Sequence, residues 1–217
     1  MPLLTLENVG IGTLALWQMT EGEEELRALC EGLEQGVGTL LWAEACSRFR
    51  APKRQREWVS VRLLLHRLGI SPAAVAYLPS GRPYLKGHAE AVSISHTQGY
   101  AAVLLSPTGP VGVDIERVSR RVHHVVDRFM DPADLPAGVE GDALTRHLLV
   151  HWSAREALFK CLDREGVDFR VHLHLAPFPA GQDEGTLQAW ETRTPSQHHY
   201  TIAYRVTRDF VLTWCRG

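Results

Sequence analysis

The sequence predicts an α+β protein built of two similar halves, and three observations support this prediction. Segments of strand-like and helix-like pattern follow one another as strand, helices and strands, and then again as strand, helix and strands. A turn-rich segment at 106–109 separates the two series. The 217 residues suit one large domain or two small ones that share an interface. We therefore expect an N-terminal half over residues 1–108 and a C-terminal half over residues 109–217.

The N-terminal half is expected to begin with a strand over Thr13–Trp17. Thr20, with Glu23 three residues later, has the spacing of a capping box and predicts a helix that ends near Leu33. Ser80-Gly81-Arg82-Pro83 predicts a turn. Two more helices and two strands complete this half, at 40–49 and 52–68 for the helices and at 92–95 and 100–105 for the strands.

The C-terminal half is expected to begin with a strand at 111–116 and, after a loop at 131–141, to continue with a long helix. Asp142 is a suitable N-cap for that helix, which ends near Leu162. Apolar residues at 169, 171, 173 and 175 alternate with polar ones and predict a half-buried strand. A hairpin of strands at 200–206 and 210–214 closes the chain.

Composition and charge exclude several classes of protein. Hydrophobic residues make up 45% and charged residues 22%, which is an ordinary globular balance. The net charge of -2 gives no basic surplus for binding nucleic acid. No stretch approaches the roughly 20 apolar residues of a membrane helix, and Met1–Thr5 lacks the basic and apolar regions of a secretion signal. We therefore expect a cytoplasmic protein without nucleic-acid or membrane partners.

Four cysteines are present, and no two have the spacing of a zinc or dithiol motif. Cys30, Cys46 and Cys161 fall in helical patterns among apolar residues. They are expected to be reduced residues of the core.

Two carboxylates project together from the strand at 111–116. Asp114 and Glu116 are two residues apart, so their side chains point to the same face of a strand that is otherwise apolar. Adjacent like charges repel unless a cation neutralises them, and hard oxygen ligands suit Mg²⁺. The alternative is a strand with one solvent-exposed face.

A second group lies on the long helix. Trp152, Glu156 and Lys160 are spaced four residues apart and therefore line one face. Glu156 could be a metal ligand or a general base, and Lys160 could hold a phosphate. The alternative is that Glu156 and Lys160 form a surface ion pair.

Two further segments could bind an anion. Ser93–Gly99 ends a strand in hydroxyl residues, a histidine and a glycine, all of which can donate to phosphate oxygens. The helix that starts near Pro52 carries cations at its beginning, where an anion would relieve their conflict with the helix dipole. These cations are Lys53, Arg54, Arg56 and, one face along, Arg62. The alternatives are a self-capped strand end and a solvated charged face.

Four motifs in this order resemble the 4′-phosphopantetheinyl transferases, specifically the larger monomeric members of two similar halves. The motifs are Gly81-Arg82-Pro83-Tyr84, Ser93-Ile94-Ser95-His96, Gly112-Val113-Asp114-Ile115-Glu116 and Trp152-Ser153-Ala154-Arg155-Glu156-Ala157-Leu158-Phe159-Lys160. Together with the basic helix start, they cover Lys53 to Lys160, about half of the chain.

The resemblance implies a pseudo-dimer of two halves, each a small antiparallel sheet packed with helices, with coenzyme A in the cleft between them. Asp114, Glu116 and Glu156 match metal ligands, with Mg²⁺ expected and Mn²⁺ left open, and the ion would bridge these three carboxylates to the pyrophosphate, so that Asp114 also counts among the residues that bind coenzyme A. The expected contacts of coenzyme A are His96 and Lys160 at its phosphates, Gly81, Arg82, Pro83 and Ser95 along its nucleotide, and Lys53 or Arg54 at its 3′-phosphate.

The activity that the resemblance implies is transfer of phosphopantetheine from coenzyme A to a serine of an acidic apo carrier protein, with adenosine 3′,5′-bisphosphate as leaving group. Glu156, Lys160 and His96 are the expected catalytic residues, with Glu156 as candidate base. The carrier could belong to fatty acid, polyketide or nonribosomal peptide synthesis. A monomer is expected. The alternatives are a non-catalytic homologue that binds coenzyme A or a carrier, and a metal-dependent phosphohydrolase.

Three features stand apart from this pattern. Arg155 occupies a position that is usually lysine in the family, so a planar fork replaces a point charge. Relatives carry a further acidic residue in the loop at 131–141, and Asp131, Asp134 and Glu140 all remain open for it. A basic cluster after the carboxylate strand is either a docking face for an acidic carrier or solvated surface. It consists of Arg117, Arg120, Arg121 and Arg128.

Overall fold

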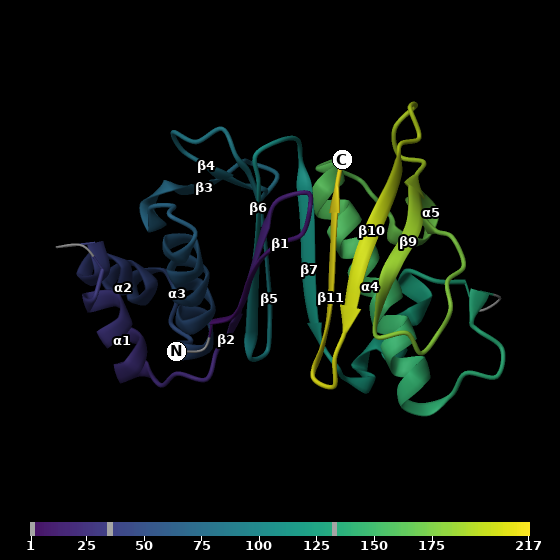
Figure 1. Cartoon of the computed structure of the whole chain (residues 1–217), viewed down its shortest axis with the longest axis horizontal. Helices are drawn as coiled ribbons and strands as arrows, with labels where there is room; N and C mark the ends of the chain where they lie inside the picture. Colours follow the sequence, from purple (N-terminus) through teal and green to yellow (C-terminus); the bar gives the residue numbers. More distant parts are fainter. Residues whose placement is uncertain (1–2, 34–36, 132–133) are drawn as a thin grey trace.

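The computed structural model describes residues 3–33, 37–131 and 134–217. Four layers follow one another along the long axis of the molecule, as Figure 1 shows. A group of helices covers a four-stranded sheet, that sheet packs on a five-stranded sheet, and one long helix covers the far side. Both sheets are antiparallel throughout. The predicted α+β class is therefore confirmed.

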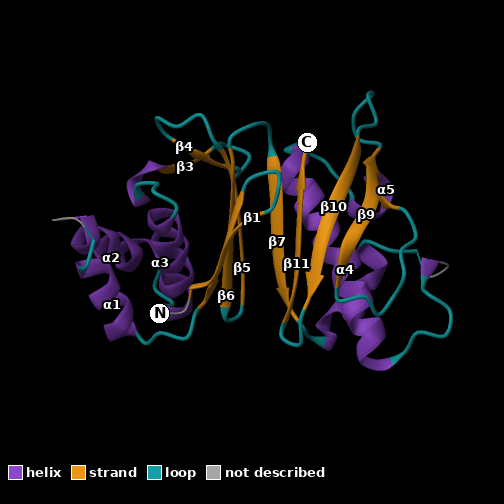
Figure 2. Ribbon diagram, viewed as in Figure 1, coloured by secondary structure: helices purple, strands orange, loops and turns teal. Residues whose placement is uncertain are grey.

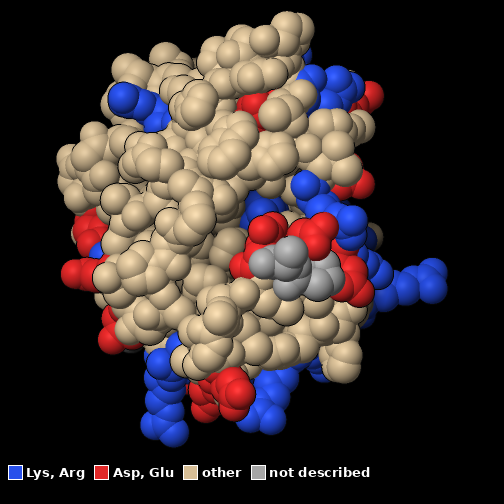
Figure 3. All heavy atoms as spheres, turned by 90° about the vertical axis from the view of Figure 1, so that its right-hand side faces the viewer, with Lys and Arg blue, Asp and Glu red and all other residues tan. Residues whose placement is uncertain are grey.

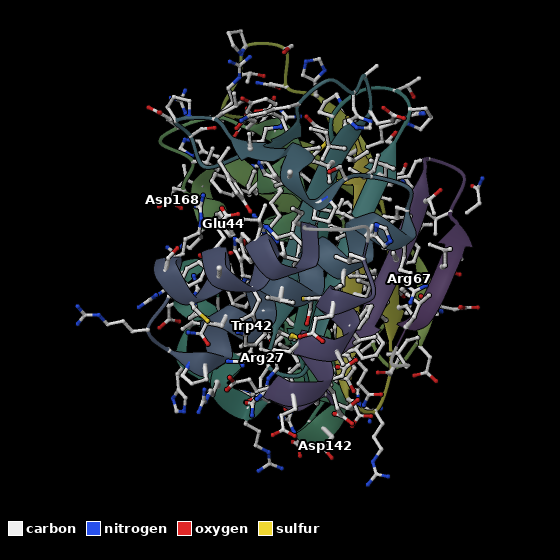
Figure 4. The ribbon with its side chains drawn as sticks, turned by 90° about the vertical axis from the view of Figure 1, so that its left-hand side faces the viewer. Arg27, Trp42, Glu44, Arg67, Asp142 and Asp168 are labelled. Carbon is white, nitrogen blue, oxygen red and sulfur yellow. The ribbon has the colours of Figure 1, made fainter. Side chains whose placement is uncertain are left out.

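The first sheet has the strand order β1-β2-β6-β5. Its strands are β1 (Leu3–Asn8), β2 (Thr13–Gln18), β6 (Tyr100–Ser106) and β5 (Ala91–Thr97). Helices α1 (Glu23–Glu31), α2 (Val37–Arg48) and α3 (Pro52–Arg67) pack on its outer face through an apolar core that includes Trp17, Leu64 and Val103. Figure 4 looks onto these helices, where the guanidinium of Arg27 lies 5.1 Å from the ring centre of Trp42 and ties α1 to α2.

The second sheet has the strand order β7-β11-β10-β9-β8. Its strands are β7 (Val111–Arg117), β11 (Phe210–Arg216), β10 (His199–Val206), β9 (Glu184–Glu191) and β8 (Leu173–Leu175). Helix α4 (Gly141–Leu162) packs directly on β7 (Figure 2). Only glycine permits this contact at Gly112, because a Cβ there would lie 1.8 Å from the carbonyl oxygen of Ala157.

The inner faces of the two sheets form a third apolar cluster, which includes Leu14 and Leu104 on one side and Val113, Ile115 and Leu212 on the other. Short elements complete the chain. They are η1 (Pro72–Ala74), β3 (Val75–Tyr77), β4 (Pro83–Leu85), η2 (Arg120–His124), η3 (Val126–Arg128) and α5 (Phe169–His172).

Side-chain hydroxyls of β5 bind the free edge of β7. The backbone N–H groups of Val113, Ile115 and Arg117 donate to the hydroxyls of Ser93, Ser95 and Thr97, at 3.0, 3.3 and 3.3 Å. The two sheets are therefore joined without a backbone ladder, and the edge of β7 is not left unpaired.

Two predicted helix caps are wrong. Helix α1 begins after Gly22 rather than Thr20, and the carboxylate of Glu25 accepts a hydrogen bond of 2.9 Å from the Gly22 N–H. Helix α4 begins two residues earlier than predicted, with Glu140 at the N-cap position and Asp142 in its first turn.

The strand predicted at 169–175 is also wrong over most of its length. Residues Phe169–His172 form the short helix α5, and only Leu173–Leu175 is a strand. The reason is Asp168, whose carboxylate accepts hydrogen bonds from the N–H groups of Arg170 and Val171 at 2.9 and 3.0 Å and so caps a helical turn.

Cys46 is exposed, which contradicts its predicted place in the core, whereas Cys30, Cys161 and Cys215 are buried, and all four are free thiols. No helix among the described residues is both long and apolar enough to cross a membrane. The division of the chain at residues 108 and 109 stays a prediction. Met1 and Pro2, whose sequence entered the localisation argument, and residues 132 and 133 of the 131–141 loop lie outside the described residues.

Candidate active site

A cleft of about 870 Å³ lies where the two sheets meet. Its walls come from α3, the turn after β3, β5, β7, the C-terminal end of α4 and the segment 163–167. Most of the residues selected from the sequence line this cleft: Arg54, Gly81, Arg82, Pro83, Ser95, His96, Asp114, Glu116, Glu156 and Lys160. Lys53 is the exception and lines a neighbouring hollow instead.

Asp114 is at the centre of the polar network on the cleft floor. Only 4% of the residue is exposed, and its Oδ1 accepts hydrogen bonds from Lys160 Nζ at 2.7 Å and Ser95 Oγ at 2.8 Å. Lys160 also donates to the carbonyl oxygen of Val113 and to Ser95 Oγ, both at 3.0 Å. Lys160 therefore pairs with Asp114, which differs from the surface pair with Glu156 that its spacing allowed.

Glu116 and Glu156 flank this network. Burial, followed by the negative charge of Asp114, raises the pKa of each to about 7. Trp152 Nε1 donates to Glu116 at 2.9 Å, which holds that carboxylate in place. Three carboxylates thus share one region where their mutual repulsion favours binding of a proton or another cation.

The donor set fits a divalent cation in chemistry and charge. Asp114 Oδ2 is buried and has no hydrogen-bond partner among the described residues, and carboxylate oxygens are what Mg²⁺ prefers. The arrangement is not that of a complete site, since no three His, Cys, Asp or Glu side chains within the described ranges are grouped to hold an ion. The other oxygen of Asp114, Oδ1, forms an ion pair with Lys160.

His96 lies at the end of β5, and its Nδ1 is 3.7 Å from a carboxylate oxygen of Glu57 on α3. Burial lowers the pKa of His96, while the charge of Glu57 opposes this shift. Glu57 also accepts a hydrogen bond of 3.3 Å from Arg54 and lies 3.7 Å from Lys53. The Lys53 side chain is 68% exposed, so Arg54 is the better placed of the two cations.

Arg82 and the turn around it close the cleft at one end. Arg82 forms an ion pair of 3.1 Å with Asp163, just after α4, and Ser80 donates to the same carboxylate at 3.0 Å. Gly81 has a φ of +87°, which glycine adopts without strain. The turn therefore connects the first half of the chain to the segment just after α4.

Three residues that line the cleft were not predicted from the sequence as possible ligand contacts: Glu57 and Trp58 of α3, and Tyr77 of β3. Arg62 was noted only as part of a basic face. Arg62 is just 4% exposed, and its guanidinium lies 3.5 Å from the ring centre of Trp58. Glu57 is four residues from Lys53, and Trp58 is four residues from Arg62. This helical spacing places each beside a basic residue, and it could have marked both as candidates for the cleft.

Arg155 points away from this cleft. Its guanidinium donates to the carbonyl oxygens of Leu173 and His151, both at 3.1 Å. The replacement of lysine by arginine therefore affects another region of the molecule.

Comparison with known proteins concerns the C-terminal part of the chain, which carries Asp114, Glu116 and Glu156. Residues 110–215 match the sequence model of the 4'-phosphopantetheinyl transferase superfamily. This part of the chain is therefore similar to that superfamily. The superfamily match contains β7 and α4, and therefore Asp114, Glu116, Glu156 and Lys160.

One curated relative is the "Putative 4'-phosphopantetheinyl transferase slr0495" of Synechocystis sp.. It is 25% identical to this chain over 142 residues, and the match spans 58% of this chain and 58% of the relative. The match therefore spans less than two thirds of the length of this curated relative.

Proposed function

We propose that this protein transfers the 4′-phosphopantetheine group of coenzyme A to a serine hydroxyl of an apo carrier protein and releases adenosine 3′,5′-bisphosphate. The single observation that carries the proposal is the cleft at the sheet junction. It combines three carboxylates with the cations Arg54, Arg82 and Lys160, within a volume of about 870 Å³. A pyrophosphate needs cations around it, and clustered carboxylates suit a metal ion bound to that pyrophosphate.

The proposed roles follow from position. Lys160 is fixed between β5 and β7 and would hold a phosphate oxygen as a point charge. His96, near Arg54 and Glu57, would donate to another phosphate oxygen. Arg82, Gly81 and Pro83 would line the nucleotide, with Arg54 nearer the 3′-phosphate than the exposed Lys53. Ser95 is proposed to act by orienting Asp114 and Lys160 rather than by direct contact alone.

The chemistry is a displacement at the β-phosphorus. The serine oxygen forms a bond to this phosphorus while the bond to the bridging oxygen breaks, and the bridging oxygen leaves with the adenosine 3′,5′-bisphosphate. Glu156, which lines the cleft beside Lys160, is the proposed base for the serine proton. Positioning and charge neutralisation supply most of the catalysis in such a reaction.

Asp114, Glu116 and Glu156 are the residues that would hold Mg²⁺, with Mn²⁺ as the alternative ion. When bound, the ion would neutralise the charge of the pyrophosphate. The partnerless Oδ2 of Asp114 is the oxygen that supports this assignment.

An acidic carrier is the proposed partner. Arg117, Arg120, Arg121 and Arg128 are all exposed and lie between β7 and the loop that leads to α4. A basic face beside the cleft would steer an acidic partner toward it. The protein is proposed to act as a cytoplasmic monomer.

Intact-mass spectrometry of a panel of apo carrier proteins tests the proposal. The panel includes carriers of fatty acid, polyketide and nonribosomal peptide synthesis, each incubated with this protein, coenzyme A and Mg²⁺. A gain of one phosphopantetheinyl group that disappears with EDTA is the expected result, and it would identify the carrier.

Two other results would support the alternatives. Tight binding of coenzyme A without transfer to any carrier would indicate a non-catalytic homologue. Release of phosphate or cleavage of coenzyme A without a carrier would indicate a phosphohydrolase, in which water replaces serine as nucleophile.

A further inference from the structure

A second hollow, of about 620 Å³, lies in the C-terminal half and has no part in the proposed transfer. It borders a different face of α4 from the one that carries Glu156 and Lys160. His147, His151 and Arg155, spaced four residues apart, line this face. The other walls come from segments near Phe129 and Phe178 and from Trp190 of β9.

Arg155 is a buried cation that forms no ion pair with any carboxylate in the described part of the chain. It is 7% exposed, and its hydrogen bonds go to two carbonyl oxygens and to Nδ1 of His151. None of the described carboxylates forms an ion pair with it, although the charge of the exposed Asp134 acts on it from a longer distance. Buried charges in proteins are normally paired, because an isolated one is costly to desolvate.

The two histidines extend this cation into a directed chain of hydrogen bonds. A guanidinium can only donate, so His151 Nδ1 accepts from Arg155 at 3.2 Å. Burial lowers the pKa of both histidines, that of His151 to about 2, and both are therefore neutral at pH 7. Neutral His151 then carries its proton on Nε2 and donates to His147 Nε2, also at 3.2 Å.

This series of hydrogen bonds ends at the second imidazole, that of His147. Because its Nε2 accepts, neutral His147 must carry its proton on Nδ1. That nitrogen is buried and has no hydrogen-bond partner among residues 3–33, 37–131 and 134–217, in a residue that is only 6% exposed. The N–H of His147 needs an acceptor and the guanidinium of Arg155 needs a negative charge, and an anion would supply both.

The walls are aromatic and apolar. The ring of Phe178 lies 4.6 Å from that of His147 and 4.7 Å from that of His151. Phe129 lies 5.9 Å from the Arg155 guanidinium, and Trp190 stacks on His174 at 5.3 Å. These surfaces would accept an apolar or aromatic body behind the anionic group.

The rim of the hollow carries both signs of charge. Arg170 and Asp131 lie 3.9 Å apart there, together with Asp134 and His174. Figure 3 looks onto this end of the molecule, where acidic and basic side chains lie side by side on a largely uncharged face. The rim thus carries one arginine and two aspartates, whereas the floor carries the buried guanidinium of Arg155.

We infer that this hollow binds a small organic anion, a carboxylate or phosphate on an apolar or aromatic body, with Arg155 and His147 as donors to the anionic group. A metal ion fits less well, because Nε2 of His151 is occupied as a donor and a cation would lie beside Arg155. The inference does not depend on the transfer activity.

Calorimetric titration of the full chain with benzoate, phenyl phosphate and neutral benzyl alcohol tests the inference. Both anions should bind, benzyl alcohol should not, and the better anion identifies the preferred head group. Arg155→Met should raise the Kd at least about tenfold, since a hydrogen bond to a charged group is lost. Arg82→Met removes an arginine of the active-site cleft and is the matched control, with a Kd within about twofold of wild type.

Histidine ring signals in carbon-resolved NMR give a second test, which needs no variant and so holds even if Arg155→Met does not fold. Benzoate should shift the assigned Cε1–H signals of His147 and His151 and leave that of His96 in place. Shifts at His96 alone, equal binding by Arg155→Met, or a loss of binding in Arg82→Met would overturn the inference. So would a wild type that binds neither anion while Asp134→Asn binds both, because Asp134 would then be the counter-ion.

Discussion

The Lys160 ammonium lies 2.7 Å from Oδ1 of Asp114, and this ion pair joins the last turns of α4 to the middle of β7. The pair is not isolated, because Ser95 of the other sheet binds both partners. Three elements that are distant in the sequence therefore fix the position of one cation. A shift of any of them would displace the group proposed to hold a phosphate.

Lys160→Met is expected to lower kcat/KM for coenzyme A by about 100-fold or more, since one preorganised charge on the phosphate is lost. Steady-state kinetics with a carrier identified by mass spectrometry would measure it. Lys53→Met is the control, and we expect less than about a threefold change because that side chain is 68% exposed and outside the cleft. Equal losses in the two variants would contradict the assigned phosphate role.

Glu116→Gln and Glu156→Gln are expected to abolish the rise in Tm that Mg²⁺ gives the wild-type protein in the presence of coenzyme A. Each removes one carboxylate from the proposed ion site, and stabilisation by a ligand depends on its affinity for the folded state. Differential scanning calorimetry with and without EDTA measures the effect. Glu31→Gln, an exposed change on α1, should keep the full response. A full response in both cleft variants would remove the metal assignment.

Ser93→Ala should reduce the free energy of unfolding by about 1–3 kcal/mol, because the buried N–H of Val113 loses its acceptor. Urea unfolding followed by circular dichroism would give the value. Ser47→Ala removes an exposed hydroxyl that binds a carbonyl within α2, and its effect should stay below about 0.5 kcal/mol. A Ser93 variant as stable as the Ser47 control would mean that the hydroxyl contacts at the edge of β7 contribute little.

The buried pair His147 and His151 predicts a loss of stability in mild acid. Burial lowers the pKa of both in the folded state, whereas the unfolded chain takes up protons near pH 6.5. Below that pH the unfolded state binds more protons, so the free energy of unfolding falls as the pH falls. Each histidine contributes a slope of at most about 1.4 kcal/mol per pH unit.

Urea titrations at several values between pH 7.5 and 5 would measure this slope. The pKa values of His96 and His174, also lowered by burial, add to it in the same direction. Glu116 and Glu156, whose pKa burial raises to about 7, contribute the opposite sign, so the comparison with the His151 variant isolates the histidine contribution. His151→Gln should flatten the slope, and His66→Gln, at an exposed position, should leave it unchanged. A slope that His151→Gln does not alter would show that His151 is not buried in its neutral form.

Strands and helices that have a regular hydrophobic pattern and end at a glycine or proline could be predicted from the sequence. The strands β5, β6 and β7 are short, apolar and separated by glycine turns, and α3 runs from Pro52 to a glycine that adopts a positive φ, Gly69. The edge strand β1 escaped prediction because its alternate residues Leu4 and Leu6 are exposed, which blurs the hydrophobic pattern. At 169–172 the alternation of apolar residues was genuine, but one side chain, Asp168, decided the local structure.

The residue types of the cleft could be predicted in the same way, but their partners could not. The spacing of Asp114 and Glu116 placed both on one face, yet nothing in it showed that Lys160 would pair with Asp114. The hydroxyls of Ser93 and Ser95 were read as phosphate donors, whereas in the fold both bind the edge of β7. Such contacts depend on how two sheets pack, and local sequence carries no signal for that.

The junction between the sheets also bears on any attempt to split the protein. Apart from the polar contacts along β5, it is an apolar surface formed by side chains such as Leu14, Leu104, Val113 and Leu212. Fragments produced by cleavage in the Pro107–Pro110 turn would each expose one such surface to water. Such fragments should recombine when mixed and aggregate when kept apart, which makes this turn a natural point for a complementation assay built on the protein.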